Sequence, residues 1–153
     1  MSSSISIKNF LGNNPINDLS IEQQHQMEEL LSRVNDVLRL SGVEGLICTS
    51  GFRSMADHLR IYSKKIIENK QHNLTNPKDL RHEHFGIPMK SRHLTAQAID
   101  IGGANIKELQ KWCLENEEIL AGLQLWCEDF SVTTNWTHFQ SAPPASGKRF
   151  FLP

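Results

Sequence analysis

The stretch SRHLTAQAID, residues 91–100, places His93 and Asp100 seven positions apart among mostly small and apolar residues. Burying a carboxylate in such surroundings costs several kcal/mol unless a charge or a hydrogen bond compensates it, and a cation between the two side chains would do so. Residues 98–101 are predicted to form a strand that ends at Gly102-Gly103. Asp100 is therefore expected within a strand, with His93 just before it.

Helical patterns dominate the first half of the chain. Ser20 and Gln23 have the spacing of a capping box, and Gly42 is expected to end the helix that they begin. A second helix is expected to begin at Ser54, three residues before Asp57. The apolar residues of the first helix recur at helical spacing: Met27, Leu30, Leu31, Val34 and Leu38.

Short strands are predicted mainly in the second half. Residues 123–127 and 136–140 are expected to pair through a polar turn, and Leu46-Ile47-Cys48 forms a further strand. A third helix is expected after Asn105. The proline-containing tail, residues 141–153, can form neither a helix nor a central strand. The sequence thus predicts an α+β fold, a small single domain with helices packed on a short antiparallel sheet.

The length of 153 residues suits one domain, residues 20–153, preceded by an irregular N-terminal arm at residues 1–19. The polar stretch 69–90 is predicted to be a long loop or flap that borders the site. Within it, His82-Glu83-His84 lacks the histidine spacing of a zinc-binding helix, so a second metal site is not expected there.

The composition argues against several classes of protein. The chain is 39% apolar with a net charge of −1, and it has no run of about 18 apolar residues. We expect no membrane insertion, and no nucleic acid as a partner, because the basic stripe that phosphates require is missing. The N-terminus lacks a secretory signal pattern, so synthesis in the cytoplasm is expected. The cysteines are expected to be free thiols, and the protein a monomer.

Two further fragments complete a candidate metal site. SGFRS, residues 50–54, lies at a strand-to-helix turn, and NWTH, residues 135–138, places His138 in a late strand. Together with His93 and Asp100, His138 gives two nitrogen donors and one oxygen donor, which suit Zn²⁺ better than Mg²⁺ or Ca²⁺. Each histidine alone is better explained as a hydrogen-bonded core residue. For Asp100 the alternative is a helix or turn cap, which its place within Ala-Ile-Asp-Ile disfavours. The three in this order favour a metal site.

These fragments resemble the zinc D-Ala-D-Ala carboxypeptidase family, which also contains D-alanyl-D-alanine dipeptidases and phage endolysins that cut L-alanyl-D-glutamate bonds. The family signature Ser-x-His-x-x-Gly-x-Ala-x-Asp is matched by Ser91, His93, Ala98 and Asp100. Ala96 stands where glycine is usual, a change expected to affect packing more than chemistry. The resemblance covers roughly residues 46–140, without the stretch 69–90.

The resemblance implies a role for each matched residue. His93, Asp100 and His138 would bind zinc. Arg53 would hold a substrate carboxylate or carbonyl oxygen, since its planar fork suits bidentate contact with a carboxylate. Ser91 would contact the substrate or orient the metal loop, and Trp136 would line the floor of the site.

The general base is where the sequence departs from the family. Many members carry Asp or Glu three residues before the last histidine, and this position is Asn135 here. The nearest carboxylates are Glu128 and Asp129, at the end of the preceding predicted strand. Strand alternation puts Glu128 on the same face as Trp126, so we favour Glu128, with Asp129 as the second choice.

The resemblance implies a zinc-dependent metallopeptidase, a hydrolase that cuts peptide stems of bacterial peptidoglycan as a carboxypeptidase or an endolysin-type endopeptidase. A bacteriophage or prophage lysis enzyme is the expected setting, acting at the cell wall or periplasm after release from the cytoplasm. Because of Asn135, the alternative is a zinc-containing binding or structural module of a phage particle that has lost catalysis. A third option is a peptidase for free dipeptides.

Overall fold

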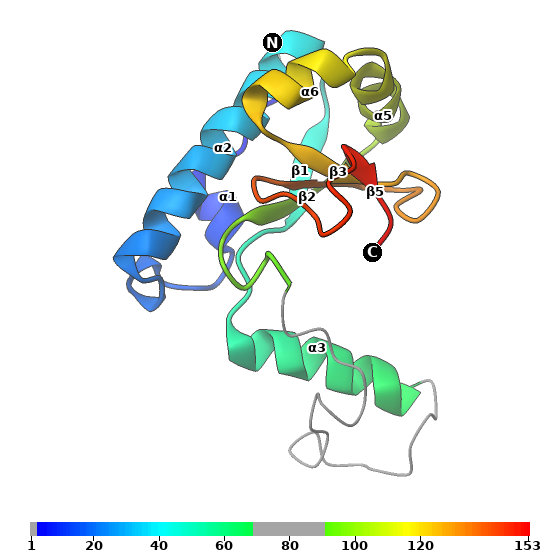
Figure 1. Ribbon diagram of the computed structural model, residues 1–153. Helices are drawn as coiled ribbons and strands as arrows, with labels where there is room; N and C mark the ends of the chain where they lie inside the picture. The colour runs from blue at the N-terminus through cyan, green and yellow to red at the C-terminus, as the bar shows by residue number, and fades with distance from the viewer. Residues whose placement is uncertain (1–2, 69–90) are drawn as a thin grey trace.

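The structure is a computed structural model that describes residues 3–68 and 91–153 (Figure 1). The predicted loop at 69–90, with His82, Glu83 and His84, lies outside the described residues. The α+β class is confirmed. The helices are α1 (Ile7–Leu11), a 3-10 turn (Ile16–Asp18), α2 (Ile21–Ser41), α3 (Met55–Glu68), α5 (Ile106–Glu115) and α6 (Glu117–Leu123). The strands are β1 (Leu46–Ser50), β2 (Ala98–Gly103), β3 (Trp126–Glu128), β4 (Thr137–Gln140) and β5 (Phe150–Phe151).

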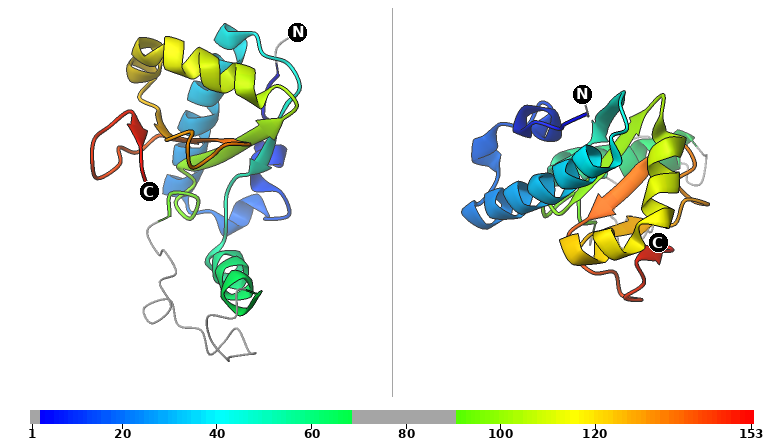
Figure 2. Two further views of the ribbon diagram at one scale, coloured as in Figure 1. Left: turned by 90° about the vertical axis from the view of Figure 1, so that its right-hand side faces the viewer. Right: turned by 90° about the horizontal axis from the view of Figure 1, so that it is seen from above.

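The strands form one five-stranded sheet in the order β1-β2-β4-β3-β5. All neighbouring pairs are antiparallel except β3 and β5, so the predicted antiparallel sheet acquires one parallel edge. That edge is supplied by the proline-containing tail, which adds only the short strand β5. Figure 1 and the left view of Figure 2 place α5 and α6 on one side of the sheet and α3 on the other.

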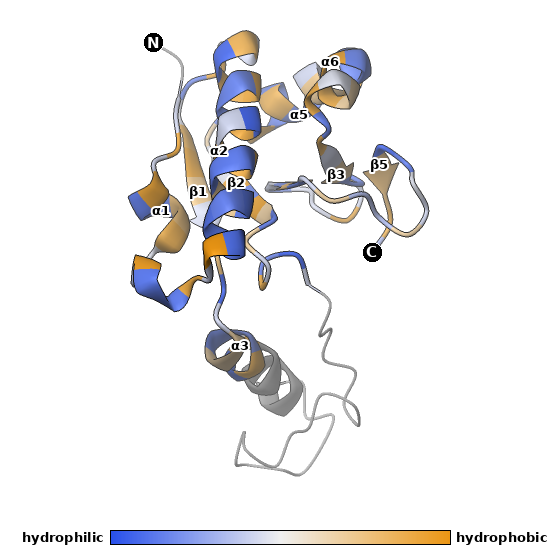
Figure 3. Cartoon of the chain, turned by 60° about the vertical axis from the view of Figure 1, so that its left-hand side comes forward, coloured by the Kyte–Doolittle hydropathy of each residue, from blue (hydrophilic) through white to orange (hydrophobic). Residues whose placement is uncertain are grey.

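One face of the sheet belongs to the hydrophobic core. Ile99, Ile101, Cys127 and Phe139 alternate along β2, β3 and β4 and are fully buried. Helix α2 contributes the predicted stripe and Val37 to the same core, while its opposite side is hydrophilic (Figure 3). No helix in the described ranges is long and apolar enough to cross a membrane.

The ends of α2 follow the sequence prediction. Ser20 and Gln23 form the capping box, and Gly42 closes the helix in the left-handed conformation with a φ of 66°. The predicted strand at 123–127 is shorter than expected, because α6 extends to Leu123 and the strand begins at Trp126. The three cysteines are free thiols, as predicted.

The N-terminal segment differs from the irregular arm that was predicted for residues 1–19. It forms α1, which starts at a capping box between Ser6 and Asn9. Phe10 is 1% exposed and Leu11 is buried, so α1 is part of the core. The helix has five residues, too few for a periodic pattern to distinguish it from a loop.

Helix α1 also contacts the turn after β1. The backbone N–H of Phe52 donates to the carbonyl oxygen of Phe10 at 3.0 Å, and Asn14 Nδ2 donates to the carbonyl of Phe52 at 3.4 Å. A Cβ atom on Gly51 would lie 2.1 Å from the same Phe10 oxygen. Only glycine fits at position 51, because the atom that it would meet belongs to the backbone.

Ala96 has a backbone conformation that explains the usual glycine. Its φ is 60°, in the left-handed region, and its side chain is fully buried. The methyl group finds room in the core, so the effect of alanine falls on the backbone rather than on packing, contrary to the sequence expectation. Left-handed geometry costs about 1–2 kcal/mol for a residue other than glycine.

Gly51→Ala is expected to lower the free energy of unfolding by at least about 1–3 kcal/mol, because the new methyl group forces α1 away from the turn. Chemical denaturation measures the change. Gly122→Ala is the matched control, since Gly122 lies in α6 and no atom comes within 4 Å of the position that an added methyl group would take. That change should stabilise the protein by about 0.5–1 kcal/mol. Equal effects of the two substitutions would contradict the close approach.

Ala96→Gly is expected to change the free energy of unfolding by no more than about 1 kcal/mol. Relief of about 1–2 kcal/mol of backbone strain is offset by a lost buried methyl group and a more flexible unfolded chain. Ala96→Val should destabilise by at least about 2 kcal/mol, because a β-branched residue is poorly tolerated at positive φ. Thermal unfolding of both variants tests this, and a neutral valine would refute it.

Candidate metal centre

The register of the sheet brings polar side chains of three strands into one row. Asp100 on β2 pairs with His138 on β4, and Ser50 on β1 pairs with Asp100. The register between β1 and β2 shifts at Thr49, and this bulge directs Ser50 to the face of Asp100. Directly opposed residues share a face, so these side chains lie on the face opposite the apolar core residues of β2 and β4.

His93 joins this row from the turn that precedes β2. Asp100 Oδ1 lies 2.9 Å from His138 Nδ1, and Asp100 Oδ2 lies 3.4 Å from His93 Nε2. One ligand atom from each residue lies within 4.8 Å of the others. These three residues are the only such group of potential metal ligands in the described part of the chain. The structure therefore brings together the ligand set that the sequence predicts.

A backbone carbonyl determines the tautomer of His93. Its Nδ1 lies 2.8 Å from the carbonyl oxygen of Gly51, which can only accept a hydrogen bond. Nδ1 must therefore carry a proton, which leaves Nε2, 3.4 Å from Asp100 Oδ2, as the nitrogen available to a cation between the two side chains. The turn is bound to His93 a second time, because the backbone N–H of Arg53 donates to the backbone carbonyl of His93 at 3.1 Å.

A glutamine does the same for His138. Gln140 Nε2 donates to the carbonyl of Ala142 at 2.8 Å, so its Oε1 points to His138 Nε2, at 2.9 Å. That oxygen accepts, so Nε2 of His138 carries a proton. Nδ1 faces Asp100 Oδ1 at 2.9 Å, where it donates a second proton in the charged ring or offers its lone pair to a cation in the neutral ring. Outer partners of this kind fix the orientation of histidine ligands in metal sites.

The buried charges interact strongly. Burial alone would raise the pKa of the Asp100 carboxyl, but hydrogen bonds with His138 and His93 and the charges of both rings hold the pKa well below its usual range. Burial of His138 disfavours its charged form, yet the hydrogen bond and charge of Asp100 outweigh this and raise the His138 pKa. The group thus requires positive charge beside Asp100, which either a proton or a metal cation supplies.

The donor set fits a metal ion. Two lone pairs on imidazole nitrogens and a carboxylate converge, and both rings are held by acceptors at their far nitrogens. Three protein ligands of this type are those of catalytic zinc sites, where a further position remains for water or substrate. The residues present could therefore hold Zn²⁺.

Of the two candidate bases, Glu128 lies beside this group. Trp126 pairs with Gln140 and Cys127 with Phe139, so Glu128 at the end of β3 comes opposite His138. Burial raises the pKa of Glu128. The charge of Asp100 also raises this pKa, while the charges of His138 and His93 lower it without outweighing burial.

Asp129 is engaged elsewhere. Its Oδ1 accepts hydrogen bonds from the backbone N–H and the hydroxyl of Ser131, at 2.9 Å and 2.6 Å. These bonds lower the pKa of Asp129 and hold its side chain in the turn between β3 and β4. Asn135 lies exposed further along the same connection.

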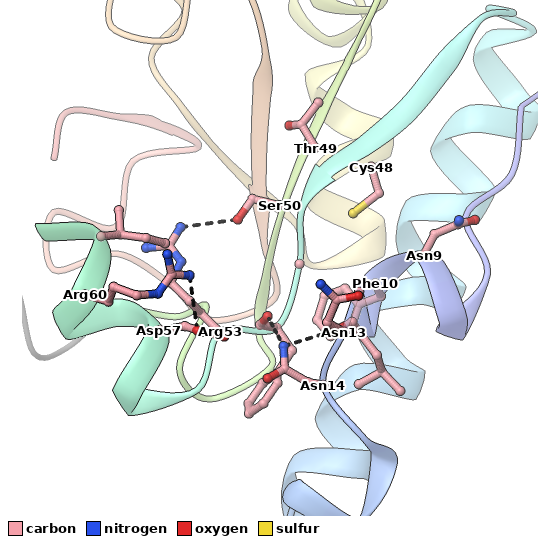
Figure 4. A pocket seen from close by; sticks show the side chains of 15 residues that line it. Asn9, Phe10, Asn13, Asn14, Cys48, Thr49, Ser50, Arg53, Asp57 and Arg60 are labelled. Atoms are coloured by element: carbon pink, nitrogen blue, oxygen red, sulfur yellow. Dashed lines mark hydrogen bonds and ion pairs between the residues drawn. The ribbon is translucent and has the colours of Figure 1, made fainter. Parts of the chain in front are cut away.

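Arg53 lies at the end of the row next to Ser50. Its Nη2 donates to Ser50 Oγ at 3.3 Å (Figure 4). Its Nη1 lies 3.3 Å from His58 Nδ1 on α3. Arg53 and Ser50 line a cleft of about 330 Å³ that continues between α1 and α3. The cleft also contains Asp57 and Arg60, whose side chains pair at 3.2 Å.

The remaining predicted residues are Ser91, two residues before His93, and Trp136, two residues before His138. Ser91 Oγ accepts from the backbone N–H of His93 at 3.4 Å. Trp136 directly precedes β4 and is 36% exposed. Its backbone carbonyl accepts a hydrogen bond from Gln110 Nε2 at 2.9 Å.

Sequence reasoning missed three contributors to the site. Gln140 could have been found, because it lies two residues after His138 in a strand and therefore on the same face. The carbonyl of Gly51 and the ring of His58 had no such signal, since their contacts with His93 and Arg53 join segments by tertiary packing.

Comparisons with known proteins do not assign the chain to a family. No family model matches it, and no curated protein does. Among solved structures, it is similar to the vancomycin resistance D,D-pentapeptidase VanY from a VanB-type resistance cassette, in complex with Zn(II). The identity is 20% over 81% of this chain and 73% of that chain, with a TM-score of 0.46. VanYB in complex with D-alanine-D-alanine is 18% identical over 92% of this chain and 86% of that chain, with a TM-score of 0.46. Likeness at this level does not assign the chain to a family.

Proposed function

We propose that the protein is a zinc-dependent peptidase. The observation that carries this proposal is the convergence of His93, Asp100 and His138, with the far nitrogen of each imidazole already bound to an acceptor. A zinc ion bound there supplies Lewis-acid chemistry, because it polarises a carbonyl group and lowers the pKa of a bound water. The remaining requirements are a general base and a group that holds the substrate.

For the general base we propose Glu128. It stands opposite His138 on the face of the ligands, whereas the Asp129 carboxylate is bound to Ser131. A carboxylate at this place could first take a proton from the attacking water and then give it to the leaving amine. One carboxylate can perform both steps if it lies between water and the leaving group.

For substrate binding we propose Arg53. Its guanidinium lines a cleft together with Ser50, which pairs with Asp100 in the sheet, and two of its N–H groups are used by Ser50 and His58. Five N–H donors are available on an arginine side chain, so three remain for a carboxylate or carbonyl oxygen. Ser91 and Trp136 border the same group from the loop before β2 and from the start of β4.

The substrate class follows from the resemblance of the sequence fragments. We propose peptide stems of bacterial peptidoglycan, cut as a carboxypeptidase or an endopeptidase. A phage or prophage lysis enzyme that reaches the cell wall after release from the cytoplasm is the setting proposed with it, as a monomer. These finer assignments rest on the resemblance of residues 46–140 alone.

Zinc is expected to bind with a stoichiometry of one per chain and to raise the thermal midpoint. A metal at 100 times its dissociation constant adds about 2.7 kcal/mol, roughly 5–10 °C for a chain of this size. Asp100→Asn and His138→Ala should remove most of this shift. Gln140→Met should weaken zinc binding by about 10–100-fold, because it removes only the outer partner of His138.

His25→Ala is the control for these variants, because His25 lies exposed on α2. Elemental analysis and calorimetry measure the metal directly. An absence of stoichiometric transition metal from the purified protein, or full zinc affinity in Asp100→Asn, would contradict the site.

Purified protein should release new termini from muropeptides, detected by mass spectrometry, and a chelator should abolish this cleavage. Glu128→Gln is expected to lower kcat by about 10²–10⁴-fold while zinc affinity changes little, since only the proton transfer is lost. Asn135→Ala is the matched control, an exposed residue of the same connection. If Asp129→Asn loses activity and Glu128→Gln does not, the base has been assigned to the wrong carboxylate.

The second candidate function is a zinc-containing binding or structural module without catalysis. Asn135 favours it, because the residue at that position cannot accept a proton from water. Under this alternative zinc binds as described, and no muropeptide or free dipeptide is cleaved.

A further inference from the structure

A buried histidine lies behind Arg53. His58 is 0% exposed, and its Nδ1 lies 3.3 Å from Nη1 of Arg53. A guanidinium has donors only, so Nδ1 must be the acceptor and the neutral ring carries its proton on Nε2. The contact is therefore a directional hydrogen bond to a charged group, and not simple packing.

The start of α3 creates this contact. Ser54 precedes the first residue of the helix. Its hydroxyl oxygen accepts a hydrogen bond from the backbone N–H of Asp57 at 3.2 Å, and its backbone carbonyl accepts from the backbone N–H of His58 at 2.9 Å. Arg53 directly precedes this first turn, and its own N–H is fixed to the His93 carbonyl at 3.1 Å. The histidine ring one turn into the helix can therefore reach back to the guanidinium.

Two side chains thus hold the two ends of the guanidinium. Ser50 Oγ, on β1, accepts from Nη2 at 3.3 Å (Figure 4), and His58, on α3, accepts from Nη1. An arginine side chain otherwise loses much conformational freedom when a ligand fixes it. Holding both Nη atoms beforehand means that less freedom is lost when a substrate carboxylate binds.

We propose that His58 is a positioning residue that orients Arg53 for a substrate carboxylate. This inference rests on the proposed function, because it takes Arg53 as the group that binds the substrate. Ser50 completes the arrangement from β1, and its pairing with Asp100 sets the place of the guanidinium relative to the metal ligands.

Two substitutions separate the hydrogen bond from the packing of the ring. His58→Leu fills much of the buried space of the ring but offers Arg53 no hydrogen-bond acceptor. His58→Asn keeps an acceptor, because the asparagine side-chain oxygen is bonded to Cγ, as Nδ1 is in histidine. On a peptide with a free terminal carboxylate, His58→Leu should lower kcat/KM about tenfold or more, mainly through KM. His58→Asn should recover most of this loss. On the matching peptide amide the zinc-loaded variants should differ little from the wild type.

His25→Leu, at an exposed site on α2, is the matched control and should behave as wild type. Equal losses on the acid and the amide, an Asn variant as poor as the Leu variant, or an unaffected Leu variant would each overturn the positioning role.

A second measurement does not depend on catalysis. In the zinc-loaded wild type, the guanidinium N–H signals of Arg53 should show slowed rotation and exchange by NMR, and His58→Leu should abolish this selectively. Unchanged Arg53 signals in a folded His58→Leu variant would overturn the inference even if the enzyme is active. A wild type that cleaves no peptide yet shows the restrained Arg53 signals would refute the proposed function and leave the His58–Arg53 contact supported.

Discussion

The structure depends on one partly buried carboxylate that needs positive charge. Asp100 lies in the second strand of the sheet with an imidazole on either side, and its low pKa reflects how strongly the site favours the ionised form. The pairing of Asp100 with His138 places both on the face away from the core. A slip of one residue between β2 and β4 would exchange these polar side chains with Ile99 and Phe139, so core packing and site assembly specify the same register.

The site is held from outside the sheet as well. The carbonyl of Gly51 fixes His93, and the turn that carries it is bound to Phe10 of α1 through a backbone hydrogen bond. The bulge at Thr49 and the absence of a side chain at Gly51 let this turn lie between α1 and the metal group. The N-terminal segment therefore supports the site indirectly, although it contributes none of the proposed ligands.

The parts that could be predicted from the sequence are those with local signals. The capping box at Ser20 and the glycine stop at Gly42 encode α2, and ordered fragments encode the ligand set. Helix α1 is too short to carry a periodic pattern, and the histidine that contacts Arg53 looks like any other helical residue. At Ala96 the motif indicates that glycine is usual but does not give the reason. The structure shows that the reason is a positive φ and not a lack of space for a side chain.

The departure at Asn135 need not remove the chemistry. A proton acceptor has to lie near the metal group, but it can come from any element that reaches that face of the sheet. The connection after β3 exposes Asn135 to solvent, while the end of β3 itself places Glu128 opposite His138. A carboxylate on a strand is positioned by the sheet register, so its placement is coupled to that of Asp100. The base proposed at Glu128 would thus be held in register with Asp100 and His138 by the same sheet.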